Sequence, residues 1–342
     1  MNSSSRGVMK MKRIRINAGS RLHFGLLDLT GDLGRVDGGI GLYLSKPRMI
    51  IEAGQSSITK SNSNTELVRH AVNQLNEHFG RNTNLDVKII EFYGQHVGLG
   101  SSTQLLLSLG KAYCQLNKVS CSVRELATIL GRGSTSGIGV AGFERGGFIM
   151  DAGHPFGPGK NKDNFLPSRA SSSSPAPVVF QRDFPREWVI EIIVPERGPG
   201  LSGEEEVDFF KKNCPISSTE SDSIARIVIS CVLPGVIEGD IETFARGINL
   251  LTTLGFKKRE IDNQFNDLKL TLQNLKVITQ NTAAIGLSSF GPTLFIIWNT
   301  EMKNKYITDV KREINHLLGR HGGKSYTTRS RNTGAISDWV DN

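Results

Sequence analysis

A turn rich in glycine and serine, GLGSS at residues 98–102, stands between a strand pattern and a helix pattern. Residues 85–92 alternate in polarity, which predicts a half-buried strand, and apolar side chains recur at helical spacing over residues 105–116. Gly98 and Gly100 let the backbone approach a ligand closely, and the amides at the start of the helix form a cradle for phosphate. A structural turn with a serine N-cap fits the same letters, so spacing alone leaves both interpretations open.

Hydroxyl groups follow the two glycines directly. Ser101 and Ser102 offer oxygen atoms to a phosphate group or to a magnesium ion. Two other glycine patterns carry less weight. Residues 137–142 match the dinucleotide-binding pattern GxGxxG, but the sequence predicts neither a strand before it nor a helix after it. The run GGKS at 322–325 follows a helix pattern, so we interpret it as the turn that ends that helix.

Polar and charged residues occur within two apolar, glycine-rich stretches near the N-terminus, at residues 20–28 and 34–41. Asp28 is a candidate magnesium ligand or base, and Arg35 is a candidate partner for a carboxylate or a phosphate. An ion pair between Asp28 and Arg35 that fixes a turn explains the pattern at least as well.

A third loop, Gly286 to Pro292, precedes the apolar strand pattern TLFIIW. Loops at strand ends often line sites, but many are ordinary turns. His23, His96 and His154 lie near the glycine-rich segments, and none has a second histidine at metal-ligand spacing. We therefore expect structural or substrate-contacting histidines rather than metal ligands.

The remaining pattern predicts an α+β protein of two domains, with a boundary near residue 180. Capping boxes are predicted at Ser63-x-x-Glu66 and Ser122-x-x-Glu125. The second half shows helix patterns at residues 222–233, 241–254 and 261–275, and a strand pattern at 188–194. Residues 155–177 are rich in proline, serine and glycine and are expected to form a flexible surface loop.

Composition narrows the class of protein. The chain has 342 residues, a net charge of +8 and only scattered basic residues, so no nucleic-acid partner is expected, whereas a small polyanionic substrate fits. No apolar run reaches the roughly 20 residues of a membrane-spanning helix, so no membrane partner is expected. The four cysteines lack metal-ligand spacing, which favours free thiols and a cytoplasmic location.

Three glycine-rich loops in this order resemble the motifs of the GHMP kinase superfamily, over residues 12–332. A finer resemblance is carried by SRLHFGLLDL, GRVDGGIGL, VGLGSSTQL, GFERGGFIMDAGH and GLSSFGPTLF. In these strings the chain resembles the β-ribofuranosylaminobenzene 5′-phosphate synthases. The resemblance implies a two-domain GHMP-kinase-like fold, with an N-terminal domain at residues 12–182, a C-terminal domain at 183–342 and a disordered extension at 1–11.

The same resemblance implies an activity. The expected reaction joins 5-phosphoribosyl 1-diphosphate to 4-aminobenzoate or 4-hydroxybenzoate, with loss of carbon dioxide and diphosphate, on the route to tetrahydromethanopterin. It also implies dependence on Mg²⁺, with Asp28 or Ser102 as possible ligands, and a homodimer. Asp28 and Arg35 are the expected catalytic residues. The expected substrate-binding residues are Ser20, Arg21, His23, Asp37, Gly98, Gly100, Ser101, Ser102, Ser288, Ser289 and Gly291.

Two features depart from the kinases of the superfamily. The proline that often opens the second motif is absent, with Gln95 and His96 near its place, and the third loop carries serines and Phe290 in place of a glycine run. Both departures disfavour an ATP-dependent small-molecule kinase, which is the main alternative. A non-catalytic protein that senses nucleotide or phosphate is the second alternative, because a fold alone does not fix a function.

Overall fold

The computed structural model describes residues 12–160, 162–167, 170–171, 173–196 and 203–340. The predicted extension at residues 1–11 lies outside them. The first half contains β1 (Arg13–Asp28), β2 (Arg35–Ser56), β3 (Lys60–Ser61), α1 (Thr65–Phe79), β4 (Asn84–Glu91), α2 (Ser101–Asn117), α3 (Val123–Ile129), α4 (Ile138–Arg145), β5 (Phe148–Asp151), β6 (His154–Pro155) and β7 (Val178–Arg182). The second half contains β8 (Val189–Pro195), α5 (Glu204–Asn213), α6 (Ser218–Ile227), the π-helix η1 (Val228–Val232), α7 (Leu233–Glu238), α8 (Ile241–Leu251), α9 (Gly255–Asp262), α10 (Asn266–Ile278), β9 (Ala284–Leu287), β10 (Leu294–Trp298), α11 (Thr300–His321), β11 (Gly323–Thr328) and β12 (Ile336–Val340).

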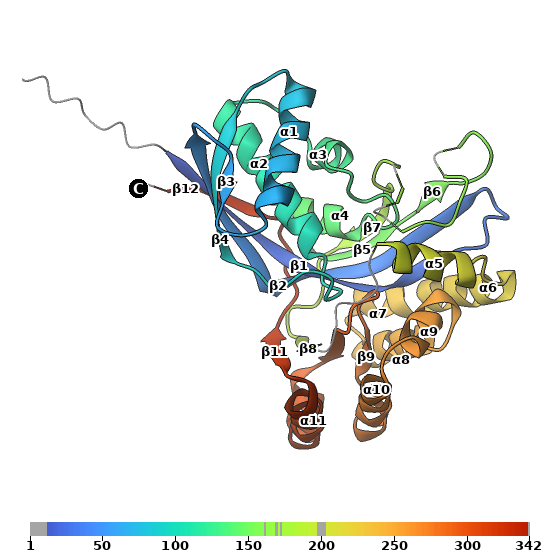
Figure 1. The fold of residues 1–342 in the computed structure, drawn as a ribbon. Helices are drawn as coiled ribbons and strands as arrows, with labels where there is room; N and C mark the ends of the chain where they lie inside the picture. Colours follow the sequence, from blue (N-terminus) through green and yellow to red (C-terminus); the bar gives the residue numbers. More distant parts are fainter. Residues whose placement is uncertain (1–11, 161, 168–169, 172, 197–202, 341–342) are drawn as a thin grey trace, which may run out of the picture.

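Two sheets organise the molecule. The larger sheet has the order β12-β1-β2-β4-β3, and β2 also pairs with β5 and β6, while β7 extends the sheet beyond β5. The smaller sheet is antiparallel, in the order β11-β8-β10-β9. The long strands β1 and β2 cross the whole molecule, with α1, α2 and α3 above the larger sheet and helices α7 to α11 below (Figure 1). The mixed helices and sheets confirm the predicted fold class.

The core is continuous between the two halves of the chain. One cluster of buried apolar residues includes Leu22 and Phe24 of β1 together with Phe244 of α8 and Phe295 of β10. The ring of Phe24 lies 5.2 Å from that of Phe295 and 6.1 Å from that of Phe244. Strand β12, at the end of the chain, pairs antiparallel with β1. The C-terminal strand thus completes the sheet that the N-terminal strand begins.

Several local predictions are confirmed by the structure. The predicted strand at residues 85–92 is β4, the predicted helix after GLGSS is α2, and Ser122 and Glu125 form a complete capping box at α3. Helix α11 ends at Gly322, so the GGKS run is a helix-ending turn as predicted.

Other local predictions are wrong. The N-cap of helix α1 is Asn64, which has a left-handed backbone and makes no side-chain capping hydrogen bond. The capping box predicted at Ser63 therefore does not form. The helix predicted at residues 261–275 is two helices, α9 and α10. Gly137 is the N-cap of helix α4, and Gly139 and Gly142 lie within that helix, although the sequence predicts no helix there.

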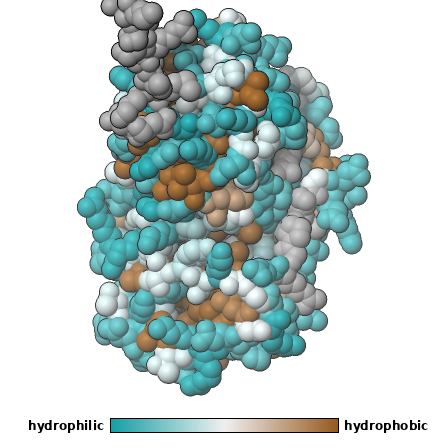
Figure 2. All heavy atoms as spheres, turned by 60° about the vertical axis from the view of Figure 1, so that its left-hand side comes forward, coloured by the Kyte–Doolittle hydropathy of each residue, from teal (hydrophilic) through white to brown (hydrophobic). Residues whose placement is uncertain are grey.

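The surface is mainly hydrophilic on the face drawn in Figure 2, where apolar colour is confined to separate patches. None of the helices in the described part of the chain has both the length and the apolar character that crossing a lipid bilayer requires.

Candidate functional site

A cleft opens where the GLGSS turn, the second half of β1 and the loop after β9 meet. Of the predicted residues, the cleft is lined by Arg21, His23, Gly98, Gly100, Ser101, Ser102, Ser289 and Gly291. Residues that were not predicted also line it, among them Leu26, Arg132, Thr135, Ser136, Glu206, Phe210 and Glu260. Three segments far apart in the sequence therefore line one cleft.

The GLGSS turn presents the N-terminus of α2 to the cleft. Gly100 is the N-cap, with a left-handed backbone (φ 76°), and no side chain of the described residues caps the helix. A serine N-cap is thus wrong, because Ser101 is the first residue of the helix. An uncapped helix start carries amide donors and a partial positive charge, which together bind an anion. The geometry therefore favours a phosphate site over a purely structural turn.

The third loop is joined to the GLGSS turn by close backbone contact. Ser288 Oγ donates a hydrogen bond to the carbonyl oxygen of Gly98 (2.7 Å) and accepts one from the amide of His23 (3.1 Å). A Cβ at Gly98 would lie 2.1 Å from the carbonyl oxygen of Ser288, and one at Gly291 would lie 2.1 Å from the carbonyl carbon of Val97. Ser288 is fully buried and does not line the cleft. It connects all three segments, whereas Ser289 and Gly291 face the cleft.

Two arginines supply positive charge on the cleft wall. Arg21 donates from Nη1 to the carbonyl oxygen of Gly98 (2.6 Å), and burial lowers its pKa. Arg132 donates from Nε and Nη2 to Thr103 Oγ1, both at 3.1 Å. The sequence signalled Arg132 only by its position in the glycine- and serine-rich stretch before α4.

A buried ion pair joins Lys257 and Glu260, which lie one helical turn apart on α9. Lys257 also donates to the carbonyl oxygen of Leu287 (3.2 Å), and burial lowers its pKa. Glu260 lines the cleft. Sequence reasoning missed this pair, whose only signal is a lysine and a glutamate three residues apart in a helix.

His23 is buried and lines the cleft, and neither of its ring nitrogens has a hydrogen-bond partner among the described residues. Burial, and then the nearby charges of Arg21 and Lys257, hold the pKa of His23 well below its usual value. The imidazole is therefore neutral at physiological pH, with one nitrogen free to accept a hydrogen bond.

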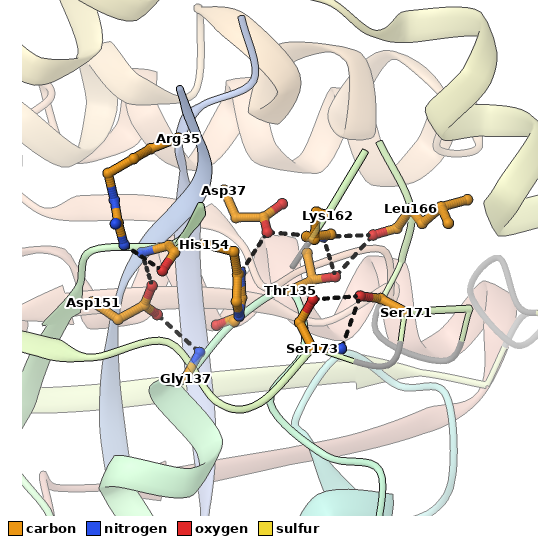
Figure 3. Close-up of polar contacts among 12 residues, drawn as sticks. Arg35, Asp37, Thr135, Gly137, Asp151, His154, Lys162, Leu166, Ser171 and Ser173 are labelled. Carbon is orange, nitrogen blue, oxygen red and sulfur yellow. Dashed lines mark hydrogen bonds and ion pairs between the residues drawn. The ribbon is translucent and has the colours of Figure 1, made fainter. Parts of the chain in front are cut away.

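Asp37 lies behind the cleft wall in a buried cluster of charged groups (Figure 3). Its Oδ2 contacts His154 Nδ1 at 2.7 Å and Lys162 Nζ at 2.8 Å. Lys162 Nζ also donates to Thr135 Oγ1 (3.3 Å) and to the carbonyl oxygen of Leu166 (3.2 Å). Asp37 thus connects the segment after β6 to Thr135, which faces the cleft.

The same cluster shows that the stretch at residues 155–177, expected to be a flexible surface loop, is buried in part among its described residues. Lys162 is only 4% exposed, and the segment that carries it packs against the cleft wall through Asp37. Sequence reasoning missed Lys162, the buried cation of this segment, because the surrounding composition is of low complexity.

The remaining predicted residues lie outside the cleft lining. Asp28 Oδ1 accepts hydrogen bonds from the amide of Thr30 (2.8 Å) and from Ser221 Oγ (3.0 Å). Arg35 donates to the carbonyl oxygens of residues 152 and 153, at 3.0 and 2.9 Å (Figure 3). In the described chain no ion pair joins Asp28 to Arg35. Ser20 is fully buried beside Arg21.

Comparison with known proteins identifies the family. Residues 66–147 match the model of the GHMP kinases N terminal domain. The chain is 35% identical over 332 residues to the β-ribofuranosylphenol 5′-phosphate synthase of Methanothermobacter thermautotrophicus, covering 94% of this chain and 97% of the relative. It is 36% identical over 326 residues to the enzyme of the same name from Archaeoglobus fulgidus, covering 94% of this chain and 98% of the relative.

The chain belongs to the β-ribofuranosylphenol 5′-phosphate synthase family. It is therefore an enzyme, as the sequence predicts. Among solved structures, this synthase resembles phosphomevalonate kinase of Streptococcus pneumoniae, with a TM-score of 0.64, 13% identity and coverage of 96% of this chain and 100% of the other. It also resembles mevalonate diphosphate decarboxylase of Staphylococcus aureus, with a TM-score of 0.63, 12% identity and coverage of 96% and 98%. At these identities the likeness concerns the fold alone.

Proposed function

We propose that this synthase joins 5-phosphoribosyl 1-diphosphate to 4-hydroxybenzoate and releases carbon dioxide and diphosphate. Relatives aligned over nearly the whole chain are named as synthases of a ribofuranosylphenol phosphate. A phenol product corresponds to a hydroxybenzoate acceptor that has lost its carboxyl group. The name therefore favours 4-hydroxybenzoate over 4-aminobenzoate, the two acceptors that the sequence left open.

The uncapped start of α2 carries the proposal for the diphosphate. The amides after Gly100, with the hydroxyls of Ser101 and Ser102, face the cleft together with Arg21 and Arg132. When the bond from the anomeric carbon to diphosphate breaks, its electron pair leaves with the diphosphate. Donors and positive charge fixed in place stabilise that negative charge as it grows. The ring carbon that bears the carboxylate then bonds to the anomeric carbon, and loss of carbon dioxide returns an electron pair to the ring.

Magnesium fits the same cleft as an ion held largely by the substrate. The described residues contain no group of three or more histidine, cysteine or acidic side chains that would form a protein cage for a metal. Mg²⁺ commonly binds through one or two carboxylates and the phosphates of a substrate. Glu206 and the hydroxyl of Ser102 are the groups of the cleft that we propose for it. A bound ion would supply positive charge to the leaving diphosphate.

The test is release of labelled carbon dioxide from carboxyl-labelled 4-hydroxybenzoate. We expect release that requires phosphoribosyl diphosphate and magnesium, and slower release from 4-aminobenzoate. Arg132→Met should raise the KM for phosphoribosyl diphosphate about tenfold, because a charge-assisted contact is worth roughly 1.5 kcal/mol. Arg145→Met, at an exposed arginine outside the cleft lining, is the matched control. No release from either benzoate, with phosphorylation of a small alcohol by ATP, would replace this proposal with a kinase.

Three broader expectations belong to the same proposal. The product enters tetrahydromethanopterin biosynthesis, the enzyme works in the cytoplasm, and it acts as a homodimer. Sedimentation of the purified protein tests the last of these directly, since a monomer at micromolar concentration would contradict it.

A further inference from the structure

Three adjacent strands of the larger sheet bring their side chains to one place on the cleft floor. Gly39 of β2 lies between Leu26 of β1 and Asp151 of β5 in the register of the sheet. Residues directly opposite one another on neighbouring strands project from the same face. His23 pairs with Gly41, two residues beyond Gly39, so it also lies on that face.

Polar atoms surround Gly39, which has no side chain of its own. A Cβ at this residue would lie 3.1 Å from His23 Nε2, 3.5 Å from Asp151 Oδ2 and 3.5 Å from Ser136 Oγ. His23 and Ser136 both line the cleft. Glycine therefore leaves an opening among three polar groups where any other residue would fill it.

The hydrogen bonds already present show what this opening lacks. Asp151 accepts from the amide of Gly137 through Oδ2 (2.9 Å) and from the amide of Gly153 through Oδ1 (3.0 Å), as Figure 3 shows for Gly137. His23 Nε2, by contrast, is buried without a partner in the described chain. A buried polar atom without a partner costs free energy unless a ligand supplies the hydrogen bond.

The charge of the opening selects the kind of group that fits. The imidazole of His23 is neutral because burial and two nearby cations lower its pKa, and burial raises the pKa of Asp151 to about 7. None of the three groups carries a positive charge of its own, and Arg21 and Lys257, the two nearby cations, already pair with the carbonyl oxygen of Gly98 and with Glu260. A neutral group that donates a hydrogen bond is the better occupant.

We propose that His23, Ser136 and Asp151 around Gly39 form the subsite for the para substituent of the aromatic acceptor. This inference rests on the proposed function. Leu26 stands opposite Gly39 and lines the same cleft, so it gives an aromatic ring an apolar surface beside the polar opening. A ribose hydroxyl, the other neutral hydrogen-bond donor in the reaction, would gain no stabilisation from that apolar surface.

The subsite also has a consequence for the chemistry. When the ring carbon opposite the para hydroxyl forms its new bond, positive charge spreads through the ring to the para oxygen. The O–H group then becomes a stronger donor, and a neutral imidazole that accepts from it stabilises the charged ring more than the ground state. His23 accordingly contributes to turnover as well as to acceptor binding.

The first test fills the opening. Gly39→Ala adds one methyl group without steric overlap below 3.0 Å, and Gly54→Ala on the same strand is a matched control, with its nearest contact 3.2 Å away at Arg13 Cγ. We expect Gly39→Ala to raise the KM for 4-hydroxybenzoate at least tenfold and to change the KM for phosphoribosyl diphosphate less than twofold. Gly54→Ala should change neither. A rise in the KM for phosphoribosyl diphosphate alone would assign the opening to the ribose and overturn the proposal.

The second test removes the hydrogen-bond acceptor. The test compares 4-hydroxybenzoate with 4-methylbenzoate, an inhibitor whose para group cannot donate a hydrogen bond. The Michaelis constant is measured for 4-hydroxybenzoate and the inhibition constant for 4-methylbenzoate. Both constants are measured in the wild type, in His23→Phe and in His23→Gln. The wild type should prefer the hydroxyl compound about tenfold, His23→Phe should lose that preference, and His23→Gln should keep part of it.

Two different failures of this test are distinguishable. An unchanged preference in His23→Phe, in a variant that still releases carbon dioxide, would overturn the subsite alone. Wild-type protein that releases no carbon dioxide would instead overturn the proposed function.

Discussion

Gly98 offers the sharpest test of how the cleft is built, because the third loop occupies the space that a side chain would need. In Gly98→Ala the new Cβ would lie 2.1 Å from the carbonyl oxygen of Ser288. An ordinary contact is near 3.4 Å, so the loop has to move by roughly 1 Å, and overpacking of this kind costs about 1–3 kcal/mol. The backbone at Gly98 is also left-handed (φ 89°), which costs a residue with a Cβ about 1–2 kcal/mol. The expected loss of unfolding free energy is therefore about 2–5 kcal/mol.

Gly80→Ala separates the two contributions. Gly80 is also left-handed (φ 60°), but a Cβ there has no atom within 4 Å. Urea denaturation should give a loss of about 1–2 kcal/mol for Gly80→Ala and a distinctly larger loss for Gly98→Ala. At urea concentrations where both variants stay folded, only Gly98→Ala should raise the KM for phosphoribosyl diphosphate. Equal losses in the two variants would show that the contact between the loops is not tight, and would refute this reasoning.

Three further predictions concern aspartates that accept hydrogen bonds inside the fold. Lys162→Met leaves Asp37 buried with one cationic partner fewer and should cost about 3–5 kcal/mol in urea denaturation, while Lys162→Met combined with Asp37→Leu should recover most of it. The folded protein keeps a proton on Asp151 up to about pH 7, whereas the unfolded chain loses this proton near pH 3.8. The contribution of Asp151 to the free energy of unfolding is therefore fully present below pH 3.8 and falls as the pH rises to 7. Asp151→Asn should remove about 1.4 kcal/mol per pH unit of that slope between pH 5 and 7, measured by urea denaturation, and an unchanged slope would contradict the assignment. Asp28→Asn keeps an oxygen that can accept the hydrogen bond from the amide of Thr30, so turnover should not change. Lower turnover at equal stability would support the catalytic role that the sequence led us to expect for Asp28.

The sequence predicts those parts of the cleft that depend on local backbone conformation. Glycines at 98 and 100 mark left-handed positions, and apolar side chains recur at helical spacing in α2, so the turn and its uncapped helix start follow from neighbouring residues. Ser122 and Glu125, which cap α3, are likewise only three residues apart. In each case the group that decides the conformation lies within a few residues of the one that responds to it.

Helix α4 shows why local propensity fails elsewhere. Its glycines argue against a helix, but they let it pack closely: a Cβ at Gly142 would lie 2.6 Å from the ring of Tyr43 on β2, and one at Gly139 would touch Thr103 of α2. Tertiary packing overrides the low helix propensity of glycine here. Lys162 and its partner Asp37, 125 residues apart, are a second case, because only the folded chain shows that they meet.

The cleft also explains how a fold shared with kinases can serve a different reaction. An uncapped helix start favours a phosphate group, whether phosphorus or carbon is the atom attacked. What differs is the group that must be held opposite the leaving phosphate. A kinase must place an alcohol, whereas the proposed synthase must place an aromatic ring and accept charge at its far end. Gly39 and His23 lie on β2 and β1, which also carry the core, so the proposed acceptor subsite belongs to the sheet, while the proposed diphosphate site is a turn. On this proposal, we expect a change of acceptor to require substitutions on those strands rather than in the GLGSS turn.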